Sequence, residues 1–323
     1  MSRPRATAGS TASDANRLAT FVATVAEQGR ELYRDLPWRR TRDPYAILVS
    51  EVMLQQTQVP RVLVRYEEWL ADFPTLDALA AAPLEAVLRA WQGLGYNRRA
   101  IALKRTAEQV VDAHVAKHAA THAQTTDASA PAPAARAPAP AMLPSDELAL
   151  RALPGIGPAT ASGIRAFAFD LPGVYLETNV RTVVLHELFA DRDGVADREI
   201  VPILAAAVDE AGRQGISARD WYYALLDYGA HLKRTVPNPS RRSAHHIRQS
   251  TFAGSVRQKR AWLLRAVMAL PGEPTEIYAA DLAAVETAAG REAPDPSMVL
   301  SVLEALETDG FLRRDAAGLW RVR

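Results

Sequence analysis

Two glutamates stand where a carboxyl group could do acid–base chemistry. Glu51 interrupts an apolar helical stretch, with AILVS before it and VML after it, and Glu177 follows the apolar run 174–176. Burial among apolar neighbours raises the pKa of a carboxyl, so Glu51 could stay protonated near neutral pH, as a general acid must. Each residue also has a structural interpretation, Glu51 as a solvated side chain and Glu177 as the cap of the helix that follows.

The segment LPGIGPATASGI, residues 153–164, predicts a phosphate site made of backbone amides. Two glycines permit a tight turn, and a helical pattern begins directly after them. Such a hairpin between helices grips one DNA strand by its phosphates, and the residues that we expect to contact DNA there are Leu153, Gly155, Ile156 and Gly157. A lysine two residues beyond the second glycine could attack a deoxyribose, but Ala159 cannot.

Two carboxyls and a phosphate-gripping hairpin favour cleavage of an N-glycosidic bond in DNA. One carboxyl protonates the departing base, and the other stabilises the sugar cation, the division of labour used in glycoside hydrolysis. The target nucleotide must first leave the base stack, which requires a wedge and a pocket. The residues that we expect to fill the gap or contact base edges are Leu54, Gln55, Gln56 and Tyr96.

Composition excludes several other classes of protein. The chain has 323 residues, of which 48% are apolar and 23% charged, the balance of a soluble globular protein of about two domains. It contains no cysteine, which excludes disulfides, thiolate zinc sites and cysteine-ligated clusters, and we expect no cofactor and no metal. Neither a secretory signal nor an apolar run long enough for a membrane span is visible, so we expect a cytoplasmic protein that is associated with the nucleoid if bacterial.

Helical periodicity dominates the sequence, so we expect an all-α fold. Three helices near 258–270, 277–289 and 296–309, followed by a two-stranded ribbon turning at 315–318, predict a winged-helix-like unit at the C-terminal end. The expected organisation is a disordered segment 1–16, a catalytic domain 17–235 with an Ala/Pro-rich insert at 118–144, a basic connector 236–256 and the winged-helix-like domain 257–323.

Basic charge is concentrated locally in a chain whose net charge is only +1. Residues 231–265 contain nine lysines or arginines and no acidic residue. This imbalance favours a polyanion partner over an ordinary solvated surface. We expect Arg241 and Arg242 in this segment to contact DNA.

Five ordered motifs together resemble the MutY-like adenine DNA glycosylases of the helix-hairpin-helix (HhH-GPD) base-excision superfamily. The motifs are PWR at 37–39, SEVMLQQTQV at 50–59, GLGYNRRA at 93–100, LPGIGPATA at 153–161 and ETNVR at 177–181, and the resemblance covers about residues 18–229, roughly two thirds of the chain. The resemblance implies an all-α, two-lobed fold that grips DNA.

The resemblance also implies roles for individual residues. Glu51 matches the general acid that protonates adenine at N7, and Asn179 matches an active-site asparagine. Gln56 and Tyr96 match residues that contact or penetrate the helix beside the lesion. Ala159 stands where lyase relatives carry their lysine, which implies an enzyme that leaves the abasic site uncut. Two arginines within the motifs are also expected to contact DNA, Arg39 and Arg181.

The sequence departs from this family in three respects that bear on function. Glu177 aligns with a catalytic aspartate, so the carboxylate is carried by one additional methylene. Lys233, Pro239 and Arg242 lie near the positions where most relatives have cysteines that bind an iron–sulfur cluster. The domain that recognises 8-oxoguanine in the family is replaced by the winged-helix-like unit.

We therefore expect a monomeric, monofunctional glycosylase that acts on double-stranded DNA containing adenine opposite 8-oxoguanine or guanine, with Glu51, Glu177 and Asn179 as its catalytic residues. Two alternatives remain open. The same fold could act on another base, such as mispaired thymine or uracil or a modified base. It could also bind DNA without catalysis, which the change from aspartate to glutamate at Glu177 would favour.

Overall fold

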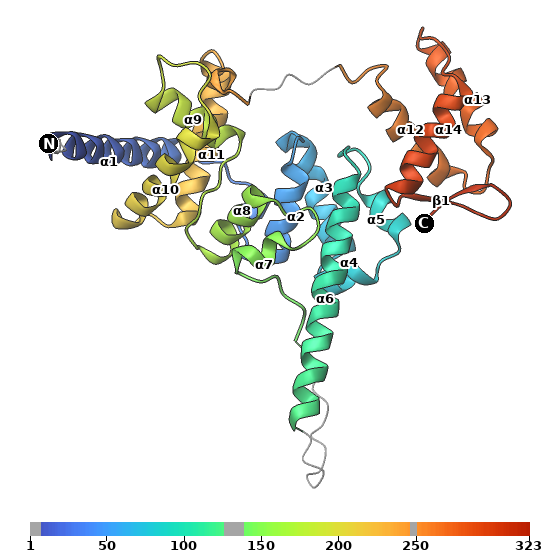
Figure 1. Ribbon diagram of the computed structural model, residues 1–323, viewed down its shortest axis with the longest axis horizontal. Helices are drawn as coiled ribbons and strands as arrows, with labels where there is room; N and C mark the ends of the chain where they lie inside the picture. Colours follow the sequence, from blue (N-terminus) through green and yellow to red (C-terminus); the bar gives the residue numbers. More distant parts are fainter. Residues whose placement is uncertain (1–7, 126–138, 246–250) are drawn as a thin grey trace, which may run out of the picture. The chain divides into compact units, whose positions relative to one another are not determined.

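The computed structural model describes residues 8–125, 139–245 and 251–323, and side chains from residue 15 onward within these ranges except 121–125. Most of this part is helical (Figure 1). Its helices, the 3-10 helices η1 and η2 included, and its strands are α1 (Ala8–Glu31), η1 (Pro37–Arg39), α2 (Pro44–Leu54), α3 (Val59–Asp72), α4 (Leu76–Ala81), α5 (Leu84–Ala90), α6 (Arg98–Thr125), α7 (Glu147–Arg151), α8 (Pro158–Phe169), α9 (Thr178–Leu188), α10 (Asp197–Arg213), α11 (Ala218–Thr235), η2 (Pro239–Arg242), α12 (Val256–Ala269), α13 (Thr275–Ala288), α14 (Pro296–Thr308), β1 (Leu312–Arg314) and β2 (Trp320–Val322).

The chain forms two compact units. The first unit contains Met1–Glu51 and Leu143–Arg248, and the second unit contains Val52–Met142 and Gln249–Arg323. The expected all-α fold is confirmed. None of the described helices is long and apolar enough to cross a membrane.

Helix α11 is the central helix of the first unit and packs against α1, α8, α9 and α10. Ser217 caps its first turn by accepting a hydrogen bond from the Asp220 amide at 3.0 Å. Helix α1 crosses α11 very closely, because a Cβ atom added at Gly29 would lie only 2.8 Å from Ala224 Cα. The core of the first unit is therefore built around one helix whose apolar residues face several neighbours.

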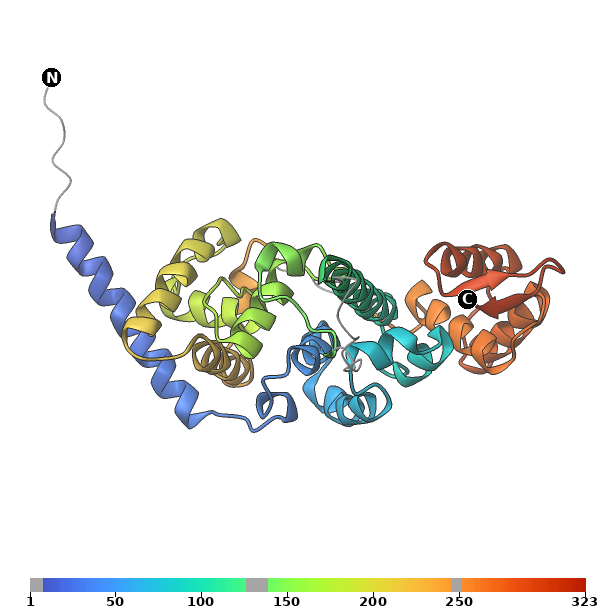
Figure 2. The same ribbon diagram turned by 90° about the horizontal axis from the view of Figure 1, so that it is seen from below.

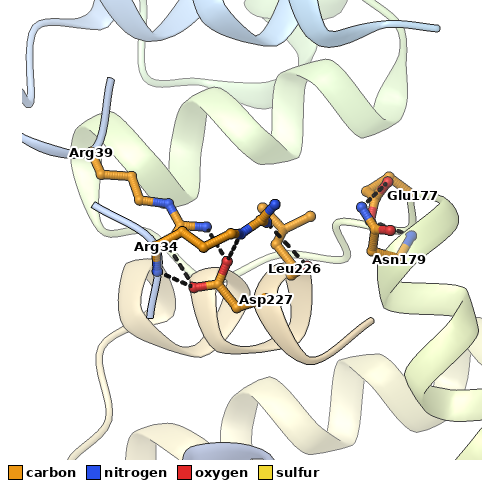
Figure 3. Close-up of polar contacts among 6 residues, drawn as sticks. All are labelled: Arg34, Arg39, Glu177, Asn179, Leu226 and Asp227. Atoms are coloured by element: carbon orange, nitrogen blue, oxygen red, sulfur yellow. Dashed lines mark hydrogen bonds and ion pairs between the residues drawn. The ribbon is translucent and has the colours of Figure 1, made fainter. Parts of the chain in front are cut away.

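Asp227 of α11 forms a buried ion-pair cluster. Its carboxylate accepts from the two terminal nitrogens of Arg39 at 2.6 and 2.8 Å and from Arg34 Nε at 2.5 Å (Figure 3). The Arg39 guanidinium also lies 4.3 Å from the centre of the Tyr223 ring. Arg39 is only 6% exposed, so its position does not support the expected DNA contact. Its role is to fix the 3-10 turn η1 against α11 through a bidentate, charge-assisted pair.

The second unit contains α3 to α6 and the C-terminal helices. Helix α6 packs against α4 and α5, and α3 packs against α5. Trp69 of α3 forms the aromatic centre, with edge contacts to Phe73 at 4.9 Å and to Trp91 at 5.4 Å between ring centres. Thr75 caps α4 by accepting from the Ala78 amide at 3.1 Å.

The C-terminal part of the second unit consists of α12, α13, α14 and an antiparallel ribbon (Figure 2). In the ribbon Leu312 pairs with Val322 and Arg314 with Trp320. Trp320 is fully buried and donates from Nε1 to Thr275 Oγ1 at 2.9 Å, which joins β2 to α13. Three helices and a ribbon match the expected winged-helix-like arrangement.

Two helices extend into segments that were expected to be irregular. Helix α1 begins at Ala8, within the segment expected to be disordered, and α6 continues to Thr125, within the expected insert. Both extensions are rich in alanine, the residue with the highest helix propensity. The proline-rich remainder of the insert, residues 126–138, lies outside the described residues.

The buried cluster at Asp227 predicts a large effect on stability. Asp227→Asn leaves the Arg39 guanidinium buried without its counter-charge, so we expect the free energy of unfolding to fall by about 3–5 kcal/mol. Urea unfolding followed by circular dichroism measures this loss. Arg89→Ala, which breaks the exposed pair with Glu85, is the matched control and should change stability little. Equal, small losses in the two variants would contradict the structural role of the cluster.

Candidate active site

Glu51 is half-buried, and its carboxyl packs against other residues of the first unit. Glu51 lies on α2 and packs against Gly163 of α8 and Tyr175, whose hydroxyl donates a hydrogen bond to it. Burial raises the pKa of Glu51 to about 8, the Tyr175 hydrogen bond opposes this shift, and the charge of Glu177 adds to it. At neutral pH the carboxyl is therefore protonated, as a general acid requires.

Glu177 is the N-cap of α9, as one interpretation of the sequence expected. Its Oε1 accepts from the amides of Asn179 at 2.5 Å and Val180 at 2.9 Å. Burial raises the pKa of Glu177 above its ordinary value, while Lys233 and the amides at the start of α9 act in the opposite direction. The helix terminus and the ammonium thus favour the charged form at Glu177, whereas burial disfavours it at both carboxyls.

Asn179 connects Glu177 to Lys233 of α11. Asn179 Nδ2 lies 3.4 Å from Glu177 Oε2 (Figure 3), and Lys233 Nζ donates to Asn179 Oδ1 at 2.7 Å. The structure therefore brings the three residues expected to be catalytic, Glu51, Glu177 and Asn179, into one neighbourhood of the first unit. Capping and chemistry are compatible at Glu177, because only one of its two oxygens accepts from the helix amides.

Two glycines inside helices permit this arrangement, and the motif analysis did not single them out. A Cβ added at Gly163 would lie 3.0 Å from the Glu51 carboxyl carbon, and one at Gly229 would lie 2.7 Å from the Asn179 carbonyl carbon. Glycine inside a helix costs roughly 0.5–1 kcal/mol relative to alanine. Such a glycine is a signal in the sequence that another group must approach closely.

The expected hairpin joins α7 to α8. Gly155 adopts a positive φ of 75°, and Gly157 is the N-cap of α8, with Pro158 in its first turn. Both glycines are exposed, whereas the side chains of Leu153 and Ile156 are buried. A DNA contact by these two apolar residues can therefore involve only their backbone.

The residues expected to contact bases lie at the end of α2 and on two loops of the second unit. Gln56 and Tyr96 both adopt left-handed backbone conformations, with φ of 55° and 48°. Such conformations are unfavourable for residues other than glycine and cluster at functional sites. Gln56 is exposed, Tyr96 is 41% exposed, and Leu54 and Gln55 are half-buried.

Arg99 holds these two loops together, a role that the sequence did not reveal. Its guanidinium donates to Gln55 O at 2.5 Å, Thr57 Oγ1 at 3.0 Å, Leu94 O at 3.0 Å and Gly95 O at 2.9 Å. One side chain therefore fixes the backbone next to both strained residues. The arginine lies three residues after Tyr96 in the GLGYNRRA motif, but nothing in its spacing indicates which carbonyls it would bind.

Other basic residues that were expected to contact DNA are engaged within the first unit. Arg181 forms a bidentate pair with Asp197 at 2.9 and 2.7 Å. Arg242 donates from one nitrogen to three carbonyls near the end of α9, and Arg241 is exposed. Their positions support an internal role for Arg181 and Arg242 and leave Arg241 as the candidate for a phosphate contact. Arg248, another arginine of the basic segment 231–265, lies outside the described residues.

The residues present cannot ligate the iron–sulfur cluster that most relatives in this family bind. A chain without cysteine has no thiolate to ligate it. Within the described ranges, no group of three or more histidines and carboxylates is placed to hold a metal ion.

A buried neutral carboxyl, a second carboxyl at a helix terminus and a helix-hairpin-helix turn are features of a DNA base-excision protein. A family model described as "HhH-GPD superfamily base excision DNA repair protein" matches residues 49–209. A solved thermostable thymine-DNA glycosylase has a similar fold, with a TM-score of 0.51 and 21% sequence identity, over 67% of this chain and 88% of that chain.

Two curated relatives match this chain over most of their own length. The chain is 31% identical over 299 residues to an adenine DNA glycosylase of Mycolicibacterium smegmatis, covering 88% of this chain and 90% of the relative. It is 30% identical over 319 residues to an adenine DNA glycosylase of Mycobacterium tuberculosis, covering 92% of each. The chain therefore belongs to the HhH-GPD superfamily of base excision DNA repair proteins, within the family of the adenine DNA glycosylases.

The raised pKa of Glu51 predicts a pH-dependent cost to stability. Between pH 4.5 and about 8 the folded protein holds a proton that the unfolded chain has lost. Stability must therefore fall as pH rises, by about 1.4 kcal/mol per unit. Glu51→Gln lacks this titration, so its melting temperature should exceed that of the wild type by an amount that grows from pH 5 to 8. Parallel curves for the two proteins would contradict the buried protonated carboxyl, and Glu27→Gln, at an exposed position of α1, is the control.

Proposed function

We propose that this protein is a DNA N-glycosylase of base excision repair that removes adenine mispaired with 8-oxoguanine or guanine and leaves the abasic site uncut. The observation that carries the proposal is the neutral Glu51 carboxyl in the same site as Glu177. A purine base can accept a proton at N7, so an acid kept protonated near neutral pH suits adenine better than a pyrimidine. The adenine DNA glycosylase relatives support the same substrate.

The two carboxyls divide the hydrolysis between them. Glu51 donates its proton to the flipped base, and the electron pair of the glycosidic bond leaves with that base. Glu177 stabilises the positive charge that develops on the sugar. Water then adds at C1′ and loses a proton, which restores the acid form of Glu51 and completes hydrolysis. Asn179 holds Glu177 in place. Ala159 offers no amine for a covalent step, and the scheme needs no resident metal or cofactor.

DNA binding is assigned to separate features of the two units. In the first unit, the free amides at the start of α8 and the exposed Gly155–Gly157 turn suit a phosphate. In the second unit, Gln56 and Tyr96 are presented on the loops that Arg99 fixes, and they suit the gap that a flipped base leaves. The partner is double-stranded DNA with a mispair, bound by a monomer, and Arg241 is proposed as a phosphate contact.

A second candidate function is removal of a different base by the same site. The second unit ends in three helices and a short ribbon, which takes the place expected for an 8-oxoguanine-recognising domain. We propose that residues 17–235 form the glycosylase domain and 257–323 a separate accessory domain joined by the connector 236–256. Recognition of the opposite base then depends on residues outside the carboxyl site.

Single-turnover excision on labelled duplexes tests the proposal. The panel contains adenine opposite 8-oxoguanine, guanine, cytosine and thymine, together with G:T and G:U pairs. We expect strand cleavage only after alkali, and only at adenine opposite 8-oxoguanine or guanine. Glu51→Gln and Glu177→Gln should each lower the rate by at least about 100-fold, because each removes a group that acts in the transition state.

Each contrary result identifies a different error. Release of thymine or uracil alone supports the second candidate function. Tight binding without release of any base supports a DNA-binding protein without catalysis. Strand cleavage without alkali contradicts the monofunctional mechanism. Glu27→Gln, on the exposed face of α1, should retain full activity and serves as the matched control.

A further inference from the structure

Two cations contact the two ends of helix α9, Lys233 of α11 and Arg242 of η2. Near its C-terminal end, Arg242 Nη1 donates to Ala190 O at 2.6 Å and Phe189 O at 3.1 Å. At its N-terminal end, Lys233 Nζ donates to Asn179 Oδ1 at 2.7 Å. A cation near carbonyls at a helix C-terminus is ordinary capping chemistry. A cation at the N-terminus opposes the helix dipole, so Lys233 requires a different explanation.

That explanation lies in the chain of contacts from Lys233 to Glu177. Lys233 donates to the Asn179 amide oxygen, which turns the amide nitrogen toward Glu177 Oε2, 3.4 Å away. Gly229, one helical turn before Lys233, lets α11 approach the Asn179 backbone so closely that a Cβ there would lie 2.8 Å from Asn179 Cα. One face of α11 therefore fixes both the backbone and the side chain of Asn179.

The positive charge of Lys233 favours the ionised form of Glu177, which the proposed hydrolysis requires. Lys233 is half-buried, and burial lowers its pKa, the charge of Glu177 raises it, and the charge of Arg181 on α9 lowers it. The ammonium in turn lowers the pKa of Glu177 against the effect of burial. Two other titratable groups interact with Glu177, Glu51 from α2 and Tyr175 from the loop before α9. Of these groups, Lys233 is the cation, so it favours the ionised form of Glu177.

We propose that Lys233 is a positioning residue of the active site, whose ammonium orients Asn179 and, through it, keeps Glu177 aligned and ionised for stabilising the sugar cation. The proposal rests on the proposed function. It goes beyond the family resemblance, in which Lys233 stands near a position of a cluster-binding cysteine. Its rival is a nucleophilic role, in which the amine condenses with the C1′ aldehyde of an abasic site and releases water to form an imine.

The first test compares single-turnover excision rates at saturating enzyme. Lys233→Met should lower the rate by about 10- to 100-fold, the scale expected for a misplaced catalytic group, with DNA affinity changed less than about threefold. Lys233→Arg should recover part of the loss because it restores the charge. Arg242→Met removes the cation at the opposite end of α9 and is the control for loss of stability alone.

A double-mutant cycle shows whether Lys233 acts through Asn179. Asn179→Ala removes the link, so adding Lys233→Met to that variant should cost little further activity. Additive losses in the double variant would overturn the proposed route. Borohydride trapping of Lys233 on an abasic-site duplex would also overturn it, in favour of the nucleophilic role.

The pH dependence separates positioning from a structural role. Loss of the ammonium raises the pKa of Glu177, so the acidic limb of the rate profile should move to higher pH in Lys233→Met and stay in place in Arg242→Met. An unmoved acidic limb, with a rate loss that follows the melting temperature as in Arg242→Met, would make Lys233 merely structural.

Carboxyl titration by carbon-13 NMR gives the same answer without requiring activity. The titration of the Glu177 carboxyl should move to higher pH in Lys233→Met, or in Lys233→Gln if Lys233→Met does not fold, and should be restored in Lys233→Arg. If the wild type excises no base, the proposed function fails, while the titration still decides the role of Lys233. If the wild type is active and the titration does not move, only the role of Lys233 fails.

Discussion

The Glu51 and Glu177 carboxyls share one buried site, and glycosidic-bond hydrolysis requires Glu51 to be neutral and Glu177 to be ionised. Burial raises the pKa of both of them. The fold separates their behaviour by what surrounds each one. Glu51 accepts a hydrogen bond from the Tyr175 hydroxyl and is kept neutral by burial. Glu177 accepts hydrogen bonds from backbone amides at the start of α9, and the positive charge of Lys233 lowers its pKa. Two residues of the same type can thus serve as acid and as carboxylate.

Close helix packing makes this separation possible in the first unit. Gly163 lets α8 contact the Glu51 carboxyl, and Gly229 lets α11 contact Asn179. The Asp227 cluster fixes the 3-10 turn that contains Arg39 against α11, the helix that also carries Lys233. A neutral carboxyl in the site and glycines inside two helices both lower stability, so the unit depends on its buried core and ion pairs to remain folded.

The sequence predicted the helices, the hairpin and the ribbon because each has a local signal in periodicity or turn residues. It also predicted the neighbourhood of Glu51, Glu177 and Asn179, through motif order and through the apolar residues beside Glu51. Side-chain partners could not be predicted, because they depend on contacts between residues far apart in the chain. Arg39 and Arg181 are arginines in DNA-glycosylase motifs, yet each pairs with an aspartate inside the first unit. The roles of Arg99 and Lys233 could not be predicted either, because the groups that accept their hydrogen bonds lie on other elements.

The alkaline limb of the excision rate tests most directly whether a protonated Glu51 drives the reaction. Single-turnover excision of adenine opposite 8-oxoguanine should be measured from pH 6 to 10 at saturating enzyme. The account predicts a rate that begins to fall near pH 8 and then drops about tenfold per unit, as Glu51 loses its proton. A rate that stays level up to pH 10, with DNA still bound, would contradict it.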